Sequence, residues 1–153
     1  MSITLVCSWT ELSAQDLEGK FYPLSKSGIS LYKPEGFELS QDFEGFINLQ
    51  IAGTIITQES DQNVSMVLMN YTRASLSEQN MQLINREQVT LTNGKEGVLF
   101  TTRFILNGNL EFERLILVTG DFKHTIIIMG NYPAQVKEQW GDEIRRSLLT
   151  AQY

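Results

Sequence analysis

The chain has 153 residues, enough for one domain whose folding buries roughly 68–70% of the unfolded surface, and its single cysteine excludes both an intramolecular disulfide and a multi-cysteine zinc site. Twelve basic against eighteen acidic residues leave a formal charge of −6, which repels nucleic-acid phosphates and anionic lipid head groups, so neither is an expected partner. No apolar run approaches the roughly 20 residues that cross a bilayer, so no membrane span is expected.

Residues 1–27 are predicted to form an N-terminal arm, because their polar residues and isolated apolar positions sustain no long helix or strand. The apolar stretch 3–7 and the small residues at 13–14 are features of an export signal, but the stretch is short and no basic segment precedes it. The arm is therefore either the remnant of such a signal or an ordinary extension, and the location stays open between exported or envelope-associated and cytoplasmic. Trp9 lies in this arm, where its ring would either anchor a partner or dock on the domain.

Residues 28–153 are predicted to form a single domain that opens with a strand. Alternation at residues 29–33 predicts this strand, and Pro34 ends it because proline cannot donate to a central ladder. A second alternation, at residues 46–51 with Phe46 set apart, predicts another strand. Its odd-numbered residues from Ile47 to Ile51 are expected to face the core, and Asn48 and Gln50 to face water.

Two more strands are expected at residues 54–57 and 64–71, on either side of a polar turn at residues 60–63. A short helix then follows. Residues 75–78 match a capping box, in which the serine and glutamate side chains each accept from the other's backbone N–H, so the helix is predicted from residue 75 to about residue 84. Its apolar positions fit one face only loosely, so packing against the sheet must stabilise it.

The most informative part of the chain is a series of four strand-like runs separated by turn residues. The runs cover residues 87–91, 96–106, 110–119 and 123–132, and the turns are Asn93-Gly94, Asn107-Gly108-Asn109 and Gly120-Asp121. Asn-Gly tolerates the positive φ of tight hairpin turns, so neighbouring runs are predicted to pair antiparallel as a meander. Two continuously apolar segments, 115–118 and 126–129, indicate strands that are covered on both faces.

The last segment is predicted to be an amphipathic helix that covers the sheet, with Pro133 in its first turn. Asp142 and Arg146 have the spacing of an ion pair on one helix face. Gly141 weakens the helix, so a close approach of helix and sheet is expected there. The apolar stripe recurs at four-residue spacing and consists of Val136, Trp140, Ile144 and Leu148.

Short motifs along the chain give it a family likeness. They are Tyr32-Lys33-Pro34-Glu35-Gly36-Phe37, Gly53-Thr54-Ile55, Phe112-Glu113-Arg114 and Tyr132-Pro133. With the order of elements, they make residues 28–150 resemble the PsbP-like superfamily, which includes the photosystem II PsbP subunit, Ran-binding nuclear-import proteins and small bacterial proteins of unknown function. No binding motif of the photosystem or Ran-binding members aligns here, so neither partner is carried over.

The hairpins and the closing stripe predict an α+β fold with a twisted antiparallel sheet of about six or seven strands flanked by helices on both faces. This is the α/β/α sandwich that the PsbP-like resemblance implies. The resemblance also implies a non-catalytic function in binding another macromolecule.

Glu111 and Glu113 alternate along one predicted strand and therefore project from the same face. Paired carboxylates could serve acid–base chemistry or hold a cation, and their spacing along a strand does not exclude glycosidase-like hydrolysis. Cross-strand pairing with a cation such as Arg103 is the ordinary arrangement on a sheet surface, and it is the one that we expect.

Other candidates for chemistry have simpler structural explanations. His124 is the only histidine, Asp121 is its nearest carboxylate in sequence, and no nucleophile elbow accompanies it, so a solvated turn histidine is expected. Residues 59–63 lack the spacing and glycine of an EF-hand, and the Asn-Gly turns lack a phosphate-loop motif, so no metal or cofactor is expected. Core packing rather than a ligand cleft is expected for Met66, Met69, Met81, Met129 and Trp140.

We therefore expect a non-catalytic binding or accessory protein that recognises a protein partner. Two alternatives stay open: an intracellular adaptor similar to the Ran-binding import proteins, and an unrecognised hydrolase that uses Glu111, Glu113 or His124. No motif specifies the partner or an oligomeric state. The residues singled out for partner binding are Arg103, Glu111, Glu113 and Trp9.

Overall fold

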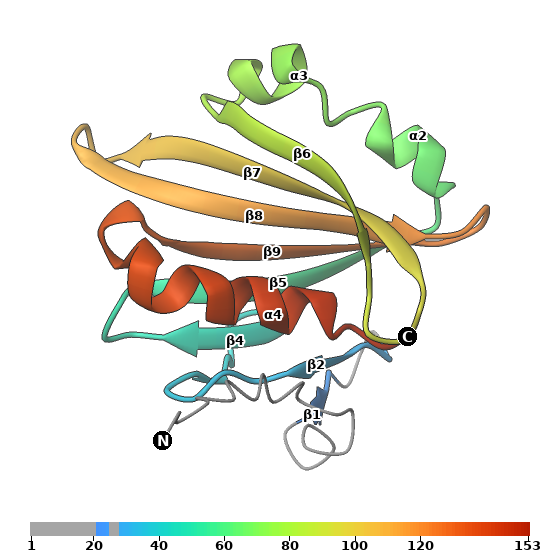
Figure 1. Ribbon diagram of the computed structural model, residues 1–153, viewed down its shortest axis with the longest axis horizontal. Coiled ribbons are helices and arrows are strands. Elements are labelled where there is room, and N and C mark those ends of the chain that lie inside the picture. Colours follow the sequence, from blue (N-terminus) through green and yellow to red (C-terminus); the bar gives the residue numbers. More distant parts are fainter. Residues whose placement is uncertain (1–20, 25–27) are drawn as a thin grey trace, which may run out of the picture.

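The computed structural model describes residues 21–24 and 28–153 (Figure 1). Cys7, Trp9 and the predicted export remnant lie outside these residues. The described part is an α+β fold with one large antiparallel sheet and a second, smaller sheet, so the predicted fold class is confirmed at this level. No helix in the described part is long and apolar enough to cross a membrane.

The large sheet has seven strands, in agreement with the prediction, and all neighbours in it are antiparallel. Its order is β3-β4-β5-β9-β8-β7-β6, so the four predicted runs form a meander and its last strand lies beside β5. The strands are β3 (Glu38–Leu39), β4 (Gly45–Asn48), β5 (Gly53–Ser60), β6 (Gln82–Thr90), β7 (Glu96–Leu106), β8 (Leu110–Gly120) and β9 (Thr125–Pro133).

The strand predicted at residues 29–33 lies outside the large sheet. It is β2 (Ser30–Tyr32), which pairs antiparallel with β1 (Phe21–Pro23) in the smaller sheet. β1 falls within the segment predicted as an arm, where the sequence pattern gave no strand signal.

Turn chemistry between the long strands follows the sequence in part. Between β7 and β8, Asn107 and Gly108 both have positive φ, at 52° and 87°, as the Asn-Gly dipeptide predicted. Between β6 and β7 only Gly94 of the Asn-Gly pair has a positive φ, at 86°, so this turn differs from the one predicted. Asn93 instead accepts a hydrogen bond from the Lys95 N–H at 3.0 Å. These turns set the register of the two central hairpins.

The C-terminal segment packs on the sheet in three consecutive pieces. They are the 3₁₀ turn η2 (Ala134–Val136), the π-helical turn η3 (Lys137–Gly141) and the helix α4 (Asp142–Leu149), which lies in front of β5, between β9 and β4, in Figure 1. The predicted ion pair is wrong in one partner, because Arg146 contacts Glu143 at 3.4 Å rather than Asp142. The predicted stripe packs against the core through Ile144 and Leu148, fully buried, and Val136 and Trp140, partly buried.

Close packing of this segment on the sheet depends on two glycines. A Cβ at Gly141 would lie 3.3 Å from the Tyr132 hydroxyl oxygen, which confirms the predicted close approach. A Cβ at Gly130 of β9 would overlap Cγ2 of Ile144 on α4. Both positions therefore set how near the C-terminal segment lies to β9.

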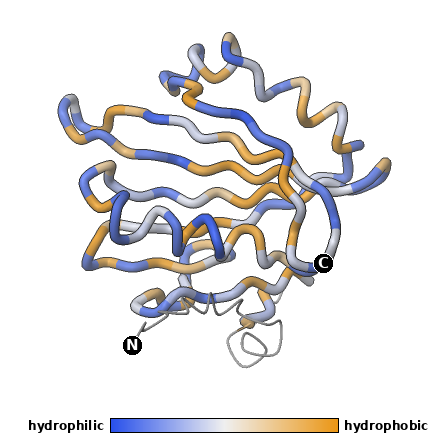
Figure 2. The backbone as a smooth tube through the Cα atoms, viewed as in Figure 1, coloured by the Kyte–Doolittle hydropathy of each residue, from blue (hydrophilic) through white to orange (hydrophobic). Residues whose placement is uncertain are grey.

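Apolar side chains of the central strands form two clusters, and neighbours along one strand belong to different clusters. Leu115 and Leu117 belong to the cluster that contains Ile144 of α4, whereas Ile116 and Val118 belong to the cluster that contains Val67. Since successive strand residues point to opposite faces, both faces of the sheet are covered at residues 115–118, as their continuous apolarity predicted. Figure 2 shows hydrophobic residues gathered on these central strands.

The strand predicted at residues 64–71 is wrong, because Val64–Leu68 forms the helix α2. Asn63 begins this helix by accepting a hydrogen bond from the Ser65 N–H at 2.8 Å. The outer positions Met66 and Met69 are exposed, so core packing is also wrong for these two methionines. Helical spacing was present in the residues that pack on the sheet, which are Val64, Val67, Leu68 and Tyr71.

The helix predicted from residue 75 to about residue 84 begins and ends earlier. It is α3 (Arg73–Glu78), and Thr72 caps it in a capping box with Ser75, so Ser75 takes the place predicted for Glu78. Asn80 has a φ of 60°, which a helix cannot continue through, and β6 begins at Gln82.

The burial pattern predicted for residues 46–51 is inverted. β4 ends at Asn48, Leu49 lies exposed in the following turn, and the buried residues are Phe46 and Asn48. The large ring of Phe46, which stands outside the alternation, takes the core position, so the even-numbered residues of the strand face inward.

Candidate functional site

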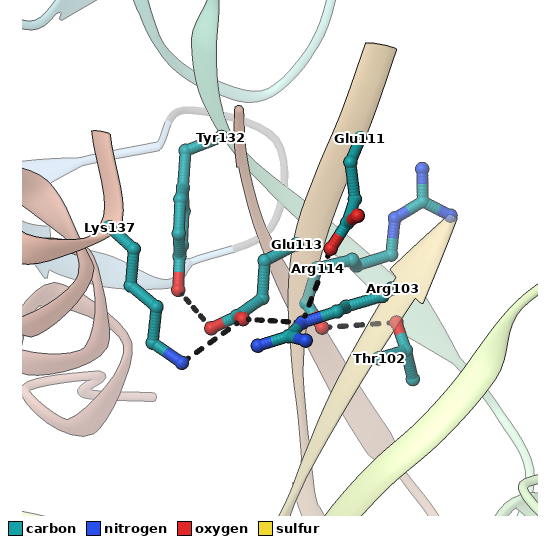
Figure 3. Close-up of polar contacts among 7 residues, drawn as sticks. All are labelled: Thr102, Arg103, Glu111, Glu113, Arg114, Tyr132 and Lys137. Carbon is teal, nitrogen blue, oxygen red and sulfur yellow. Dashed lines mark hydrogen bonds and ion pairs between the residues drawn. The ribbon is translucent and has the colours of Figure 1, made fainter. Parts of the chain in front are cut away.

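Strand register brings the two glutamates next to Arg103. β7 and β8 pair with Arg103 opposite Glu113, and Glu111 lies two residues along β8 on the same face. Both carboxylates contact one guanidinium nitrogen, because Arg103 Nε lies 3.3 Å from Glu113 Oε2 and 3.7 Å from Glu111 Oε1 (Figure 3). The expected cross-strand ion pairing is therefore present.

Glu113 is the buried centre of this arrangement, with 2% of its side chain exposed. β9 places Tyr132 opposite Glu113, and the Tyr132 hydroxyl donates to Glu113 Oε1 at 2.5 Å. Lys137 of η3 donates from Nζ to Glu113 Oε2 at 3.2 Å (Figure 3). Three strands and the η3 turn thus converge on one carboxylate in the Glu113 cluster, which consists of Arg103, Glu113, Tyr132 and Lys137.

The surroundings of Tyr132 keep its hydroxyl protonated. Burial raises the pKa of the Tyr132 phenol well above its usual value, and the hydrogen bond to Glu113 raises that pKa further. The hydroxyl is therefore a donor at neutral pH. This donor satisfies a carboxylate oxygen whose burial would otherwise cost free energy.

The geometry of the Glu113 cluster suits an internal ion-pair network better than acid–base catalysis. Both Glu113 oxygens already accept hydrogen bonds from side chains, whereas a general base must reach a proton of its substrate. Glu111 is exposed and contacts the same arginine. The pair therefore does not present two independent carboxylates to a common substrate.

His124 lies in the turn between β8 and β9. Its Nε2 is 3.5 Å from Glu59 Oε2, and Asp121 accepts hydrogen bonds from the backbone N–H groups of Lys123 and His124. Those backbone hydrogen bonds lower the pKa of Asp121. Asp121 thus closes the turn through the backbone instead of orienting the imidazole.

Within residues 21–24 and 28–153, no group of three or more His, Cys, Asp or Glu side chains could hold a metal ion. The acidic loop at residues 59–63 serves local structure, because Ser60 accepts a hydrogen bond from the Gln62 N–H and Asn63 caps α2.

Two clefts border the cluster. One, of about 420 Å³, is lined by Glu113, Tyr132 and Lys137 together with residues of α4. The other, of about 650 Å³, is lined by Arg103 and Glu111 together with residues of α3, β6 and β7. The exposed ion pair of Arg103 and Glu111 therefore opens onto the second cleft.

Apolar side chains continue this exposed surface toward the end of β7. Ile105 is 60% exposed and Leu106 is 43% exposed. Ile105 also lines the larger cleft. We call the set of Arg103, Ile105, Leu106 and Glu111 the hairpin surface.

Sequence reasoning singled out Arg103, Glu111 and Glu113, and the structure brings these three together. It missed the roles of Tyr132 and Lys137. Tyr132 was marked by its place in a predicted strand and in the Tyr132-Pro133 motif, but neither indicates a contact with Glu113. That contact depends on the register between β8 and β9. Lys137 had no signal, because its contact depends on how η3 packs on the sheet.

No family model and no curated protein matches this chain. Solved structures do match it. Cyanobacterial PsbP (CyanoP) from Synechocystis sp. PCC 6803 superimposes with a TM-score of 0.61 at 16% identity, covering 86% of this chain and 90% of that one. LpqN of Mycobacterium tuberculosis, which is involved in cell envelope biogenesis, gives a TM-score of 0.58 at 15% identity, with 81% and 82% covered.

A third match is a protein of unknown function, PA94, from Pseudomonas aeruginosa. Its TM-score is 0.55 at 12% identity, with 85% of this chain and 93% of that one covered. At such identities the likeness concerns the fold alone. The chain has the PsbP-like fold, as the resemblance in its sequence predicted.

Proposed function

We propose that this chain is a non-catalytic binding or accessory protein that recognises a protein partner through the hairpin surface. The observation that carries the proposal is the exposure of two apolar side chains at the end of β7, Ile105 on the face that bears Arg103 and Leu106 on the opposite face. Arg103 and Glu111 lie nearby with 38% and 48% of their side chains exposed. Exposed apolar residues bordered by charged groups are typical of protein interaction sites.

The Glu113 cluster supports this function because it positions the Arg103 side chain. Glu113 holds Arg103 from the buried side, so the guanidinium loses less side-chain freedom when a partner binds it. A side chain that is already positioned lowers the entropic cost of association. The cluster thus holds Arg103, a charged residue of the hairpin surface, in place before a partner binds.

The proposal extends to the organisation of the chain. Residues 28–153 act as one domain, an α/β/α sandwich in which α4 covers one face of the large sheet and α2 and α3 the other. β1 pairs with β2 and therefore belongs with the domain. Within the rest of the segment predicted as an arm, Trp9 is proposed to supply a second contact with the partner. An exported or envelope-associated setting would suit the export-signal interpretation of this arm and the involvement of LpqN in envelope biogenesis.

Two other functions were left open by the sequence. An intracellular adaptor would use the same hairpin surface in a different compartment. A hydrolase would need a carboxylate free to reach a substrate, and the hydrogen bonds to Glu113 weigh against that function.

Replacing the two apolar residues tests the proposal. The double variant Ile105→Ser with Leu106→Ser should reduce the amount of captured partner about tenfold or more, because each buried apolar side chain contributes about 1–3 kcal/mol to an interface. The measurement is quantitative affinity capture followed by mass spectrometry, with the native chain as reference.

Phe122→Ser is the matched control, since Phe122 is 87% exposed in the turn at the opposite end of β8. This variant should capture as much partner as the native chain. Equal capture by the native chain and the double variant would contradict the hairpin surface as the recognition site.

A further inference from the structure

The six arginines form two groups, one on each side of the large sheet. Arg103, Arg145 and Arg146 each contact a carboxylate, and they lie on the side where α4 packs. Arg73, Arg86 and Arg114 have no carboxylate within ion-pair distance among the described residues. These three arginines lie on the side of the large sheet where α2 and α3 pack. The chain as a whole is acidic, with a formal charge of −6.

Arg114 is the most enclosed of the three. It points to the same face as Ile116, on the opposite side of β8 from Glu113. Its Nε donates to the side-chain oxygen of Asn131, its guanidinium lies 4.9 Å from the centre of the Phe104 ring, and a terminal nitrogen lies 3.7 Å from the sulfur of Met81. Burial lowers the pKa of Arg114.

All three contacts of Arg114 are to neutral groups. A partly buried cation that lacks a counter-ion carries a desolvation cost that neutral partners offset only in part. A guanidinium also has five N–H donors arranged as a planar fork, of which one donates to Asn131 and one makes a weak hydrogen bond to the Met81 sulfur. The remaining donors are suited to a bidentate oxyanion.

A cavity lies beside this guanidinium. It has a volume of about 310 Å³ and is lined by Arg114, Asn80, Met81, Phe104 and Ile105 among others. The larger cleft of about 650 Å³ shares the last four of these residues and adds Arg73 of α3. The two spaces therefore adjoin, and each has an arginine without a carboxylate partner in its wall.

We propose that the cavity between α3 and the ends of β7 and β8 binds a small organic carboxylate, with Arg114 as the main cation and Arg73 as a second. The cavity lining is largely polar, with Gln79, Asn80 and Arg114, and Met81, Phe104 and Ile105 add apolar atoms to it. An organic carboxylate can use both kinds of group, whereas a strongly hydrated inorganic anion uses only the polar ones. The carboxylate belongs either to a free organic acid or to an acidic side chain in a peptide. This site does not require the proposed protein partner.

Titration followed by NMR tests the site in the full chain. The observable is the Nε–H resonance of Arg114, with hexanoate as the free acid and the capped peptide N-acetyl-Leu-Glu-Leu amide as the second probe. We expect a saturable shift with at least one probe, and the probe that binds identifies the source of the carboxylate. No saturable shift with either probe, or an equal shift with inorganic phosphate at the same ionic strength, would overturn the proposal.

Variants separate this site from general charge effects. Arg114→Gln should weaken binding of the active probe about tenfold or more, since charge-assisted hydrogen bonds are lost. Arg86→Gln removes an equal charge on the same side of the sheet, at a residue that lies over Phe100 rather than in the cavity wall, and should leave binding unchanged. Equal weakening by both variants would contradict the proposal.

A third variant keeps the test open if Arg114→Gln fails to fold. Arg73 is exposed on α3, so Arg73→Gln should fold normally and weaken the same probe by about threefold. Ile105 belongs to both the cavity wall and the hairpin surface, so partner capture is also measured for Leu106→Ser alone. Leu106 lines neither space, so failure of one proposal does not decide the other.

Discussion

Glu113 carries a buried negative charge that depends on partners from three other elements. Arg103 and Lys137 compensate the charge, and the Tyr132 hydroxyl satisfies the second oxygen. A buried charge is tolerated only when it is paired and hydrogen-bonded. At the scale of single residues, this carboxylate therefore joins β7, β8, β9 and η3.

Glu113→Gln should lower the free energy of unfolding by about 1–3 kcal/mol, as measured by urea denaturation. The value lies below that for a fully buried pair because Arg103 and Lys137 are 38% and 50% exposed, so water compensates part of the loss. Glu111→Gln is the control, and its exposed position predicts a change within about 0.5 kcal/mol. Equal effects of the two substitutions would contradict the central position of Glu113.

Tyr132 predicts how stability changes at alkaline pH. Its folded pKa is raised above the ordinary value near 10, so its contribution is complete below about pH 10. As the pH rises further, the unfolded chain loses the phenol proton while the folded chain retains it, and stability falls.

The loss between pH 9 and 11 should be about 1 kcal/mol smaller in Tyr132→Phe than in the native chain. Urea denaturation at several pH values measures this difference, and comparison with the native chain removes the effect of Tyr71, whose pKa burial also raises. Parallel pH profiles for the two proteins would contradict a raised pKa at Tyr132.

At the scale of elements, the position of α4 depends on Gly130. Gly130→Ala should destabilise the protein by about 1–3 kcal/mol, because the added methyl group overlaps Cγ2 of Ile144. Combining it with Ile144→Ala removes that atom, so the double variant should lose less stability than the two single variants together. Thermal and urea denaturation measure the cycle, and simple additivity would contradict the overlap.

Elements built from local signals were predictable. The Asn-Gly turn and the alternating runs predicted β7 and β8, and their hairpin register is what placed Arg103 beside Glu113. α2 was missed because its five residues are mostly apolar, and such a short run does not distinguish a strand from a helix. β4 was inverted because the ring of Phe46, rather than the longer alternation, decided which side is buried.

At the scale of the whole molecule, the predicted antiparallel sheet and its closing helical stripe define the PsbP-like fold. The candidate site was only half predictable, since Tyr132 and Lys137 reach Glu113 through packing between segments that carry no local signal for it. Net charge was an incomplete guide as well. The overall charge of −6 does not reveal that Arg73, Arg86 and Arg114 lack carboxylate partners among the described residues.

A buried polar centre joins the strands and η3, whereas the exposed hairpin surface is the site that we propose for the partner. Placing a photo-crosslinking amino acid at position 105, and in a second protein at position 122, tests this separation directly. We predict a covalent adduct with the partner from position 105 and none from position 122. An adduct from position 122 without one from position 105 would contradict the account.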